Sequence, residues 1–159
     1  MTDGKIVVVY HSQEEGNTEE AARLVARGIR ESSDCIVELH NTNEKRVDPR
    51  VLEGCAGAAI GTPDYFGYPA GGVKMFVDDW LIAKRQGAEK IGGMPLALFM
   101  THGGGGDAQE PFQDLCHHIG SQVGETLSIK GRPEGIEAEE CEGLGEELAL
   151  AVEKAGDSE

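Results

Sequence analysis

Basic residues are scarce in this sequence. It holds 14 Lys and Arg against 29 Asp and Glu, which gives a formal net charge of −15 at pH 7. Proteins that bind nucleic acids hold the phosphates with clustered Lys and Arg side chains. We therefore expect no nucleic-acid partner. The acidic charge, concentrated in residues 134–159, is typical of a solvated helix face; the functional alternative is a field that steers basic partners toward the protein or repels other anions.

Long apolar runs are also absent. A membrane-spanning helix needs about 20 predominantly apolar residues, and no stretch approaches that length. The first residues, Met-Thr-Asp-Gly-Lys, do not have the pattern of a signal peptide. The sequence therefore predicts a cytoplasmic protein that does not insert into membranes.

Cysteines are few and scattered. Cys35, Cys55, Cys116 and Cys141 stand singly, without a Cys-x-x-Cys pair. They do not form the compact set that a zinc ion or an iron–sulfur cluster requires. We expect four reduced thiols and no metal site.

No repeat, linker or low-complexity segment divides the chain. A length of 159 residues suits one domain and suffices to bury a hydrophobic core. We therefore expect a single domain over residues 1–159.

The chain begins with an apolar segment that runs into a polar turn. Residues 6–10, Ile-Val-Val-Val-Tyr, predict a strand that is buried on both faces of a parallel sheet. Apolar residues at helical spacing follow from Thr18. Unpaired N–H groups and the positive end of the helix dipole favour a phosphate at this turn. Ser12, Asn17 and Thr18 add side-chain donors, and Gly16 lets the backbone approach closely. The alternative is that Asn17 or Thr18 merely caps the helix.

Strand and helix patterns alternate along the rest of the chain. Strands are predicted at residues 35–39, 57–61, 95–100 and 126–129, and helices at about 71–86, 108–119 and 137–155, with a short helix near 41–50. Asp107 is the expected N-cap of the helix at 108–119. Five strands alternating with helices predict an α/β fold: a doubly wound five-stranded parallel sheet, in the order 2-1-3-4-5, with helices on both faces.

Two further loops follow the third and fourth strands. In such a sheet the ligand lies beyond the carboxyl ends of the strands, where the strand order reverses. The loop at 61–72 places three aromatic residues within four positions, namely Tyr65, Phe66 and Tyr68, and the loop at 101–107 holds four consecutive glycines. Together with the phosphate turn, these loops suggest a ligand with a flat ring and a phosphate tail.

These segments resemble flavodoxin-like, FMN-binding proteins. The turn that ends in Gly16-Asn17-Thr18 is similar to the phosphate loop of flavodoxins. The segment Gly61-Thr-Pro-Asp-Tyr-Phe-Gly67, with the helix that follows it, is similar to the flavin loop of flavodoxin-like quinone reductases. Residues 103–107 resemble their third flavin loop. The resemblance covers essentially the whole chain and implies a flavodoxin-like fold with FMN as a non-covalent cofactor.

The resemblance also implies a cofactor site made by three loops, without catalytic or metal-ligating residues. Its implied members are Ser12, Gln13, Glu14, Glu15, Gly16, Asn17 and Thr18; Pro63, Asp64, Tyr65, Phe66, Gly67 and Tyr68; and Thr101, His102, Gly103, Gly104, Gly105 and Asp107. The aromatic rings would pack against the isoalloxazine ring. Gly67 could present its carbonyl to the N5–H of a one-electron-reduced flavin. A protonated His102 would favour the reduced flavin anion, or this side chain simply faces solvent.

The phosphate turn departs from the flavodoxin pattern. Three residues separate Ser12 from Gly16, where short-chain flavodoxins usually have two. Glu14 and Glu15 stand where those proteins favour hydroxyl side chains. Two carboxylates aimed at a phosphate would repel it, so they must point outward or the affinity for FMN is reduced.

Three functions remain open at this point. An electron carrier fits the short chain and the acidic charge, and its partners would be redox proteins. An NAD(P)H-dependent quinone or flavin reductase fits the loop at 61–67, and its partners would be NAD(P)H and a quinone. A signalling receiver domain, which shares this strand order, is a remote alternative. The sequence is compatible with a monomer or a dimer.

Overall fold

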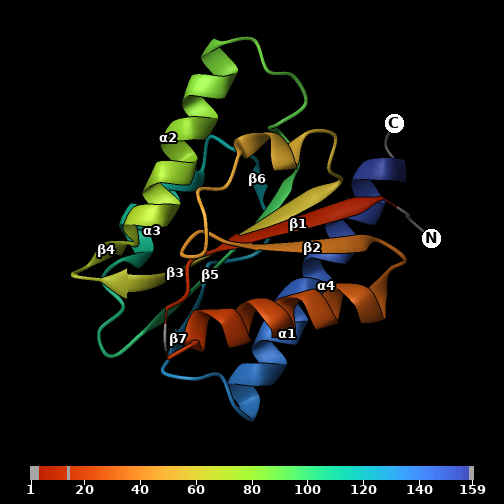
Figure 1. Cartoon of the computed structure of the whole chain (residues 1–159). Helices are drawn as coiled ribbons and strands as arrows, with labels where there is room; N and C mark the ends of the chain where they lie inside the picture. Colours follow the sequence, from red (N-terminus) through yellow and green to blue (C-terminus); the bar gives the residue numbers. More distant parts are fainter. Residues whose placement is uncertain (1–3, 14, 158–159) are drawn as a thin grey trace.

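The computed structural model describes residues 4–13 and 15–157, and it shows a twisted parallel sheet between two layers of helices (Figure 1). The main strands are β1 (Lys5–Tyr10), β2 (Ile36–Asn41), β3 (Gly57–Tyr65), β5 (Pro95–His102), β6 (Ser121–Gln122) and β7 (Leu127–Lys130). They lie in the order β2-β1-β3-β5, and β6 and β7 both pair with β5 in parallel. The predicted sheet and its order are confirmed, except that two short strands share the fifth position.

Helices cover both faces of the sheet. On one face lie α1 (Asn17–Ser32) and α4 (Ile136–Asp157), and on the other lie η1 (Pro49–Leu52), α2 (Gly71–Arg85) and α3 (Gln109–Cys116) (Figure 1). None of the helices within residues 4–13 and 15–157 is long and apolar enough to cross a membrane.

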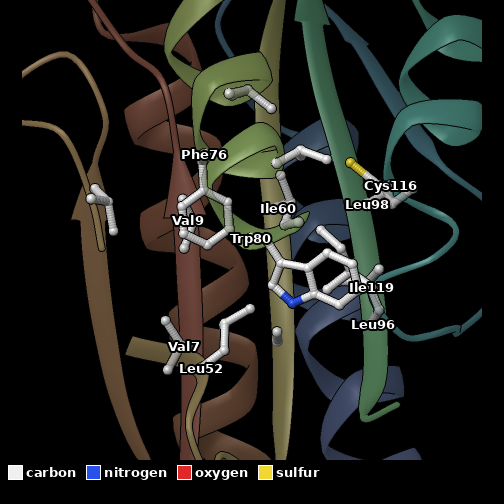
Figure 2. Close-up of a cluster of buried hydrophobic side chains, with 14 of the residues drawn as sticks. Val7, Val9, Leu52, Ile60, Phe76, Trp80, Leu96, Leu98, Cys116 and Ile119 are labelled. Carbon is white, nitrogen blue, oxygen red and sulfur yellow. The ribbon is translucent and has the colours of Figure 1, made fainter. Parts of the chain in front are cut away.

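Successive side chains of the central strands point to opposite faces of the sheet. In β1, Val7 and Val9 pack toward α2 and α3, whereas Ile6 and Val8 pack toward α1 and α4. All four are completely buried, because a central parallel strand is covered on both sides. Figure 2 shows the first of these clusters, in which Trp80 of α2 lies over the sheet. The Trp80 indole N–H donates to the carbonyl of Ile91 at 2.7 Å, so this buried polar group is satisfied.

The helices α1 and α4 approach each other closely at two glycines. A Cβ on Gly28 would lie only 2.0 Å from the backbone carbonyl oxygen of Glu142, and one on Gly145 only 2.1 Å from that of Val25. Glycine is required at both positions because backbone of the opposite helix fills the space of a side chain. This contact fixes α1 on the sheet and, with it, the turn that precedes the helix.

The third strand differs most from the sequence prediction. It continues beyond Gly61 to Tyr65 and folds back into the two-residue strand β4 (Tyr68–Pro69), which pairs with it antiparallel. The predicted loop at 61–72 therefore begins with a β-hairpin. The helix α3 is also shorter than predicted, since it begins at Gln109 with Ala108 as its N-cap and ends at Cys116.

Candidate functional site

A pocket of about 810 Å³ lies at the carboxyl ends of β1, β3 and β5. This volume falls in the range of pockets that hold cofactors and other small ligands. The pocket is at the end of the sheet where, in Figure 1, α1 begins and β4 is found. Three walls form it: the turn before α1, the end of β3 and the end of β5.

The turn before α1 leaves backbone donors free. Gly16 is the N-cap of the helix, with φ of 71°, a left-handed conformation that glycine adopts without strain. The Ser12 hydroxyl accepts the N–H of Glu19 at 3.1 Å. The N–H groups of Asn17 and Thr18, in the first turn of the helix, have no acceptor among the described residues. The alternative that Asn17 or Thr18 is the cap is therefore wrong, because both lie inside the helix.

Asn41, at the end of β2, holds this turn in place. Its side-chain oxygen accepts the N–H of Ser12 at 3.0 Å, and its side-chain nitrogen donates to the Ser12 carbonyl at 3.1 Å. Sequence reasoning missed this residue. The available signal was its position, because β2 lies beside β1 in the predicted sheet and ends at the same edge.

A buried hydroxyl pair joins the first wall to the third. The hydroxyl oxygens of Thr18 and Thr101 lie 2.8 Å apart, and each residue is 2% exposed. One hydroxyl donates to the other, which leaves the second hydroxyl hydrogen for another acceptor. The start of α1 and the end of β5 are therefore held together across the floor of the pocket.

The second wall is the hairpin of β3 and β4. Its two turn residues, Phe66 and Gly67, both have positive φ, 57° and 76°. Phe66 is fully exposed, so the hairpin carries an aromatic ring at its tip. Tyr65 lines the pocket, and its ring meets that of the buried His11 edge to face, with centroids 6.0 Å apart. Burial lowers the pKa of His11, and the Nδ1 atom of its ring lies 2.8 Å from the Thr42 hydroxyl.

Asp64 ties the hairpin to the start of α3. One carboxylate oxygen accepts the N–H of Gly67 at 2.8 Å, and the other accepts the N–H of Ala108 at 3.2 Å. The prediction that Asp107 caps α3 is therefore wrong. A carboxylate from a distant strand interacts with the start of that helix, while the side chain of Asp107 is exposed.

His102 contributes an unsatisfied group. It lies at the end of β5 and lines the pocket. Its Nδ1 atom is buried and has no hydrogen-bond partner among the described residues. A buried polar atom without a partner is costly, so this nitrogen is the unsatisfied side-chain group of the site.

Comparisons with known proteins show that the chain is similar to flavodoxins. No protein-family model matches the chain. A flavodoxin of Aquifex aeolicus (strain VF5) is 28% identical over 92% of this chain and 85% of that protein. A flavodoxin of Clostridium saccharobutylicum is 31% identical over 47% of this chain, and the match spans just under half of that relative's length.

Solved structures agree with the sequence matches. A flavodoxin from the domain Archaea superposes with a TM-score of 0.79 at 24% identity, covering 94% of this chain and 99% of that one. The chain has a flavodoxin-like fold. A WrbA-like protein of Agrobacterium tumefaciens superposes with a TM-score of 0.76 at 19% identity, over 95% and 98% of the two chains. The flavodiiron core of Synechocystis sp. PCC6803 reaches 0.79 at 21% identity, and this chain spans about a third of it, 36%.

The flavodoxin-like fold brings together most of the residues that the sequence singled out. The pocket is lined by Ser12, Gln13, Glu15, Gly16, Asn17, Thr18, Pro63, Asp64, Tyr65, Thr101, His102 and Gly103. Asn43 and Gly131 line it as well and were not predicted. Both follow strands that end at this edge of the sheet, and that position was the only sequence signal for them.

Other predicted residues lie outside the pocket lining. These are Phe66, Gly67, Tyr68, Gly104, Gly105 and Asp107, and Glu14 lies outside the described residues. The hairpin accounts for Phe66, Gly67 and Tyr68, because the Asp64 carboxylate holds its tip beside the start of α3. The Gly67 N–H is held by Asp64, and its Cα faces Asp107, with 3.7 Å between the Asp107 Cβ and the position of a Cβ at Gly67.

The donor set of this flavodoxin-like pocket fits FMN. The free N–H groups at the start of α1 and the Ser12 hydroxyl suit a phosphate. The ring of Tyr65 suits a flat aromatic system, and the His102 side chain adds a polar ring to the lining. Two lining carboxylates, Glu15 and Asp64, oppose a phosphate, and the oxygens of Asp64 both accept backbone N–H groups.

Proposed function

We propose that this pocket binds FMN without a covalent bond and that the protein transfers electrons through it. One observation carries the proposal: a single pocket combines N–H groups at the start of α1 that have no acceptor among the described residues with the Tyr65 ring and the His102 side chain. The names of the flavodoxin relatives support the same cofactor class and the same use. FMN, when bound, supplies the transfer of one or two electrons.

The protein's own residues bind and orient the cofactor. The N–H groups of Asn17 and Thr18 and the Ser12 hydroxyl would hold the phosphate. Tyr65 would pack against the ring system, and its contact with the His11 ring, with centroids 6.0 Å apart, limits the movement of the tyrosine. His102 would add its ring to the lining, while its Nδ1 is the only buried side-chain nitrogen or oxygen without a partner in the part of the chain that the structure describes.

An electron carrier is the function that these features favour. The net charge of −15 suits brief encounters with basic redox proteins, because long-range attraction raises the rate of association without a large interface. The exposed Phe66 and Tyr68 at the hairpin tip provide apolar contact beside the pocket. Basic redox proteins are the partners that this surface predicts.

An NAD(P)H-dependent quinone or flavin reductase is the second candidate. The segment Gly61-Thr-Pro-Asp-Tyr-Phe-Gly67 resembles the flavin loop of such reductases, and a WrbA-like protein shares the fold over nearly its whole length. The receiver-domain alternative has less support. Asp64, near the end of β3, is the carboxylate that this strand contributes to the pocket, and both of its oxygens accept backbone N–H groups instead of facing a phosphoryl donor.

The test is a visible absorption spectrum of the purified protein, recorded before and after FMN is added and the excess removed. Two flavin bands that stay with the protein are expected. A protein that does not retain FMN would overturn the proposal. Assays with NADH or NADPH and a quinone then separate the two candidates: turnover identifies a reductase, whereas reduction only by a partner reductase identifies a carrier.

A further inference from the structure

The pocket has an unusual charge balance. Its lining includes two carboxylates, Glu15 and Asp64, and no Lys or Arg among the described residues. Asp64 is compensated, because both of its oxygens accept backbone N–H groups. Glu15 is exposed and makes no hydrogen bond or ion pair with the described residues. Among the described residues that line the pocket, the carboxylate of Glu15 is therefore the uncompensated charge at the wall where a phosphate would bind.

The acids nearest to Glu15 along α1 are compensated as well. Glu19 accepts the Tyr10 hydroxyl at 3.2 Å and lies 3.7 Å from Arg23. Glu20 forms an ion pair with Arg132 at 2.6 Å. The arginines on this side of the pocket are thus already engaged with other carboxylates, and neither of these contacts offsets the charge of Glu15.

Glu15 stands directly before the N-cap, Gly16. The positive end of the helix dipole attracts anions there, and it attracts a side-chain carboxylate as it attracts a phosphate. A bound phosphate would therefore share this end of the helix with a negative side chain. Burial raises the pKa of Tyr65, and the charge of Glu15 raises it further. The field of Glu15 therefore also reaches the opposite wall of the pocket.

We propose that Glu15 is a specificity-determining residue, which lowers the preference of this pocket for FMN over a flavin without the phosphate. The inference rests on the proposed function. A phosphate monoester carries about −1.5 to −2 charges near neutral pH, so it is repelled by a carboxylate, whereas the neutral ribityl chain of riboflavin is not. Repulsion between unit charges at about 4 Å in water corresponds to roughly a fivefold change in affinity.

Calorimetric titrations of the flavin-free protein with FMN and with riboflavin test the inference. The proteins compared are the natural protein, Glu15→Gln and Glu146→Gln. Glu146 is exposed on α4, outside the pocket lining, so its replacement changes the net charge equally without changing the pocket. Thermal melting of each protein controls for folding.

Glu15→Gln is expected to tighten FMN binding by about three- to tenfold and to leave riboflavin binding within about twofold. The gain should shrink when the ionic strength rises from about 0.01 M to about 0.15 M, because the screening length falls from about 30 Å to about 8 Å. Glu146→Gln should leave the ratio of the two affinities unchanged.

Two results would overturn the inference in different ways. If FMN binds but Glu15→Gln leaves the ratio of FMN to riboflavin affinity unchanged, or changes it no more than Glu146→Gln does, Glu15 does not determine specificity and the proposed function stands. If neither flavin binds to the natural protein or to Glu15→Gln, the proposed function fails and the inference fails with it.

Discussion

The carboxylate of Asp64 accepts the backbone N–H of Ala108 at 3.2 Å, across 44 positions of sequence. The same carboxylate accepts the N–H of Gly67 at 2.8 Å. One side chain thus fastens the tip of the β3–β4 hairpin to the start of α3. The hairpin beside the pocket is therefore linked to the start of α3 before any ligand binds.

Replacement of Asp64 should loosen both segments together. Asp64→Ala leaves two partly buried N–H groups without acceptors, so we expect the free energy of unfolding to fall by about 1–3 kcal/mol. Urea unfolding measures that loss. Amide hydrogen exchange should show faster exchange at Gly67 and Ala108 than in the natural protein. Asp107→Ala is the matched control, since the exposed Asp107 makes neither contact. Equal exchange rates in the Asp64 and Asp107 variants would contradict this role.

The glycines between α1 and α4 allow a second test. Gly28→Ala and Gly145→Ala each force a Cβ against the backbone of the opposite helix, so we expect losses of about 1–3 kcal/mol or more. Gly143→Ala is the control, because nothing lies within 4 Å of its Cβ position. It should raise stability by about 0.5–1 kcal/mol, as alanine favours a helix over glycine. Equilibrium unfolding of the three variants measures the contrast, and equal effects would refute the close-contact explanation.

Replacement of Phe66, a turn residue with a strained backbone, should increase the stability of the fold. Its φ of 57° is disfavoured for a bulky side chain, and its ring is exposed, so little packing offsets the strain. Phe66→Asn creates the Asn-Gly pair that such two-residue hairpins favour, and it should stabilise the fold by about 1 kcal/mol. Thermal unfolding measures the change. Phe66→Leu keeps an apolar side chain with the same backbone preference, and a similar gain in that variant would show that strain is not the cause.

Burial of His11 should make the stability of the fold depend on pH, with a sign that follows from its lowered pKa. Burial holds its pKa below the ordinary value of 6.5, so below about pH 6.5 the unfolded chain binds a proton that the folded protein does not. Stability should therefore fall as the pH falls through about 6.5 toward the lowered pKa. His11→Gln should remove this part of the pH dependence. Urea unfolding at about pH 7.5 and about pH 5.5 tests it, and an unchanged difference between the two pH values in the variant would contradict the prediction.

Local sequence signals were sufficient for the first strand and the turn that follows. Residues 6–10 are apolar and β-branched, so only a strand covered on both faces buries them, and the structure has that strand at the centre of the sheet. Gly16 allows the left-handed conformation that starts α1. These properties depend on residues close together in the chain, and therefore a pattern in the sequence expresses them.

The hairpin at the end of β3 could not be predicted in the same way. Phe66-Gly67 is a poor signal for a two-residue turn, because a bulky residue rarely takes a positive φ. What holds the turn is the bond from Gly67 to Asp64 and the pairing of Asp64 with Pro69. The acceptor for the N–H of Ala108 is Asp64, which lies 44 positions earlier in the sequence. A local pattern does not reveal so distant an acceptor, and the sequence therefore pointed to the adjacent Asp107 as the cap of α3.

The sequence by itself determined the alternation of strands and helices, and with it an α/β fold in which a ligand would bind beyond the carboxyl ends of the strands, because apolar periodicity acts along the chain. Tertiary structure alone decided which side chains complete the site. Asn41 reaches Ser12 because β2 lies beside β1, and Arg23 and Arg132 pair with Glu19 and Glu20, which leaves Glu15 without an ion pair among the described residues. Such contacts depend on distances across the fold, which no local pattern encodes.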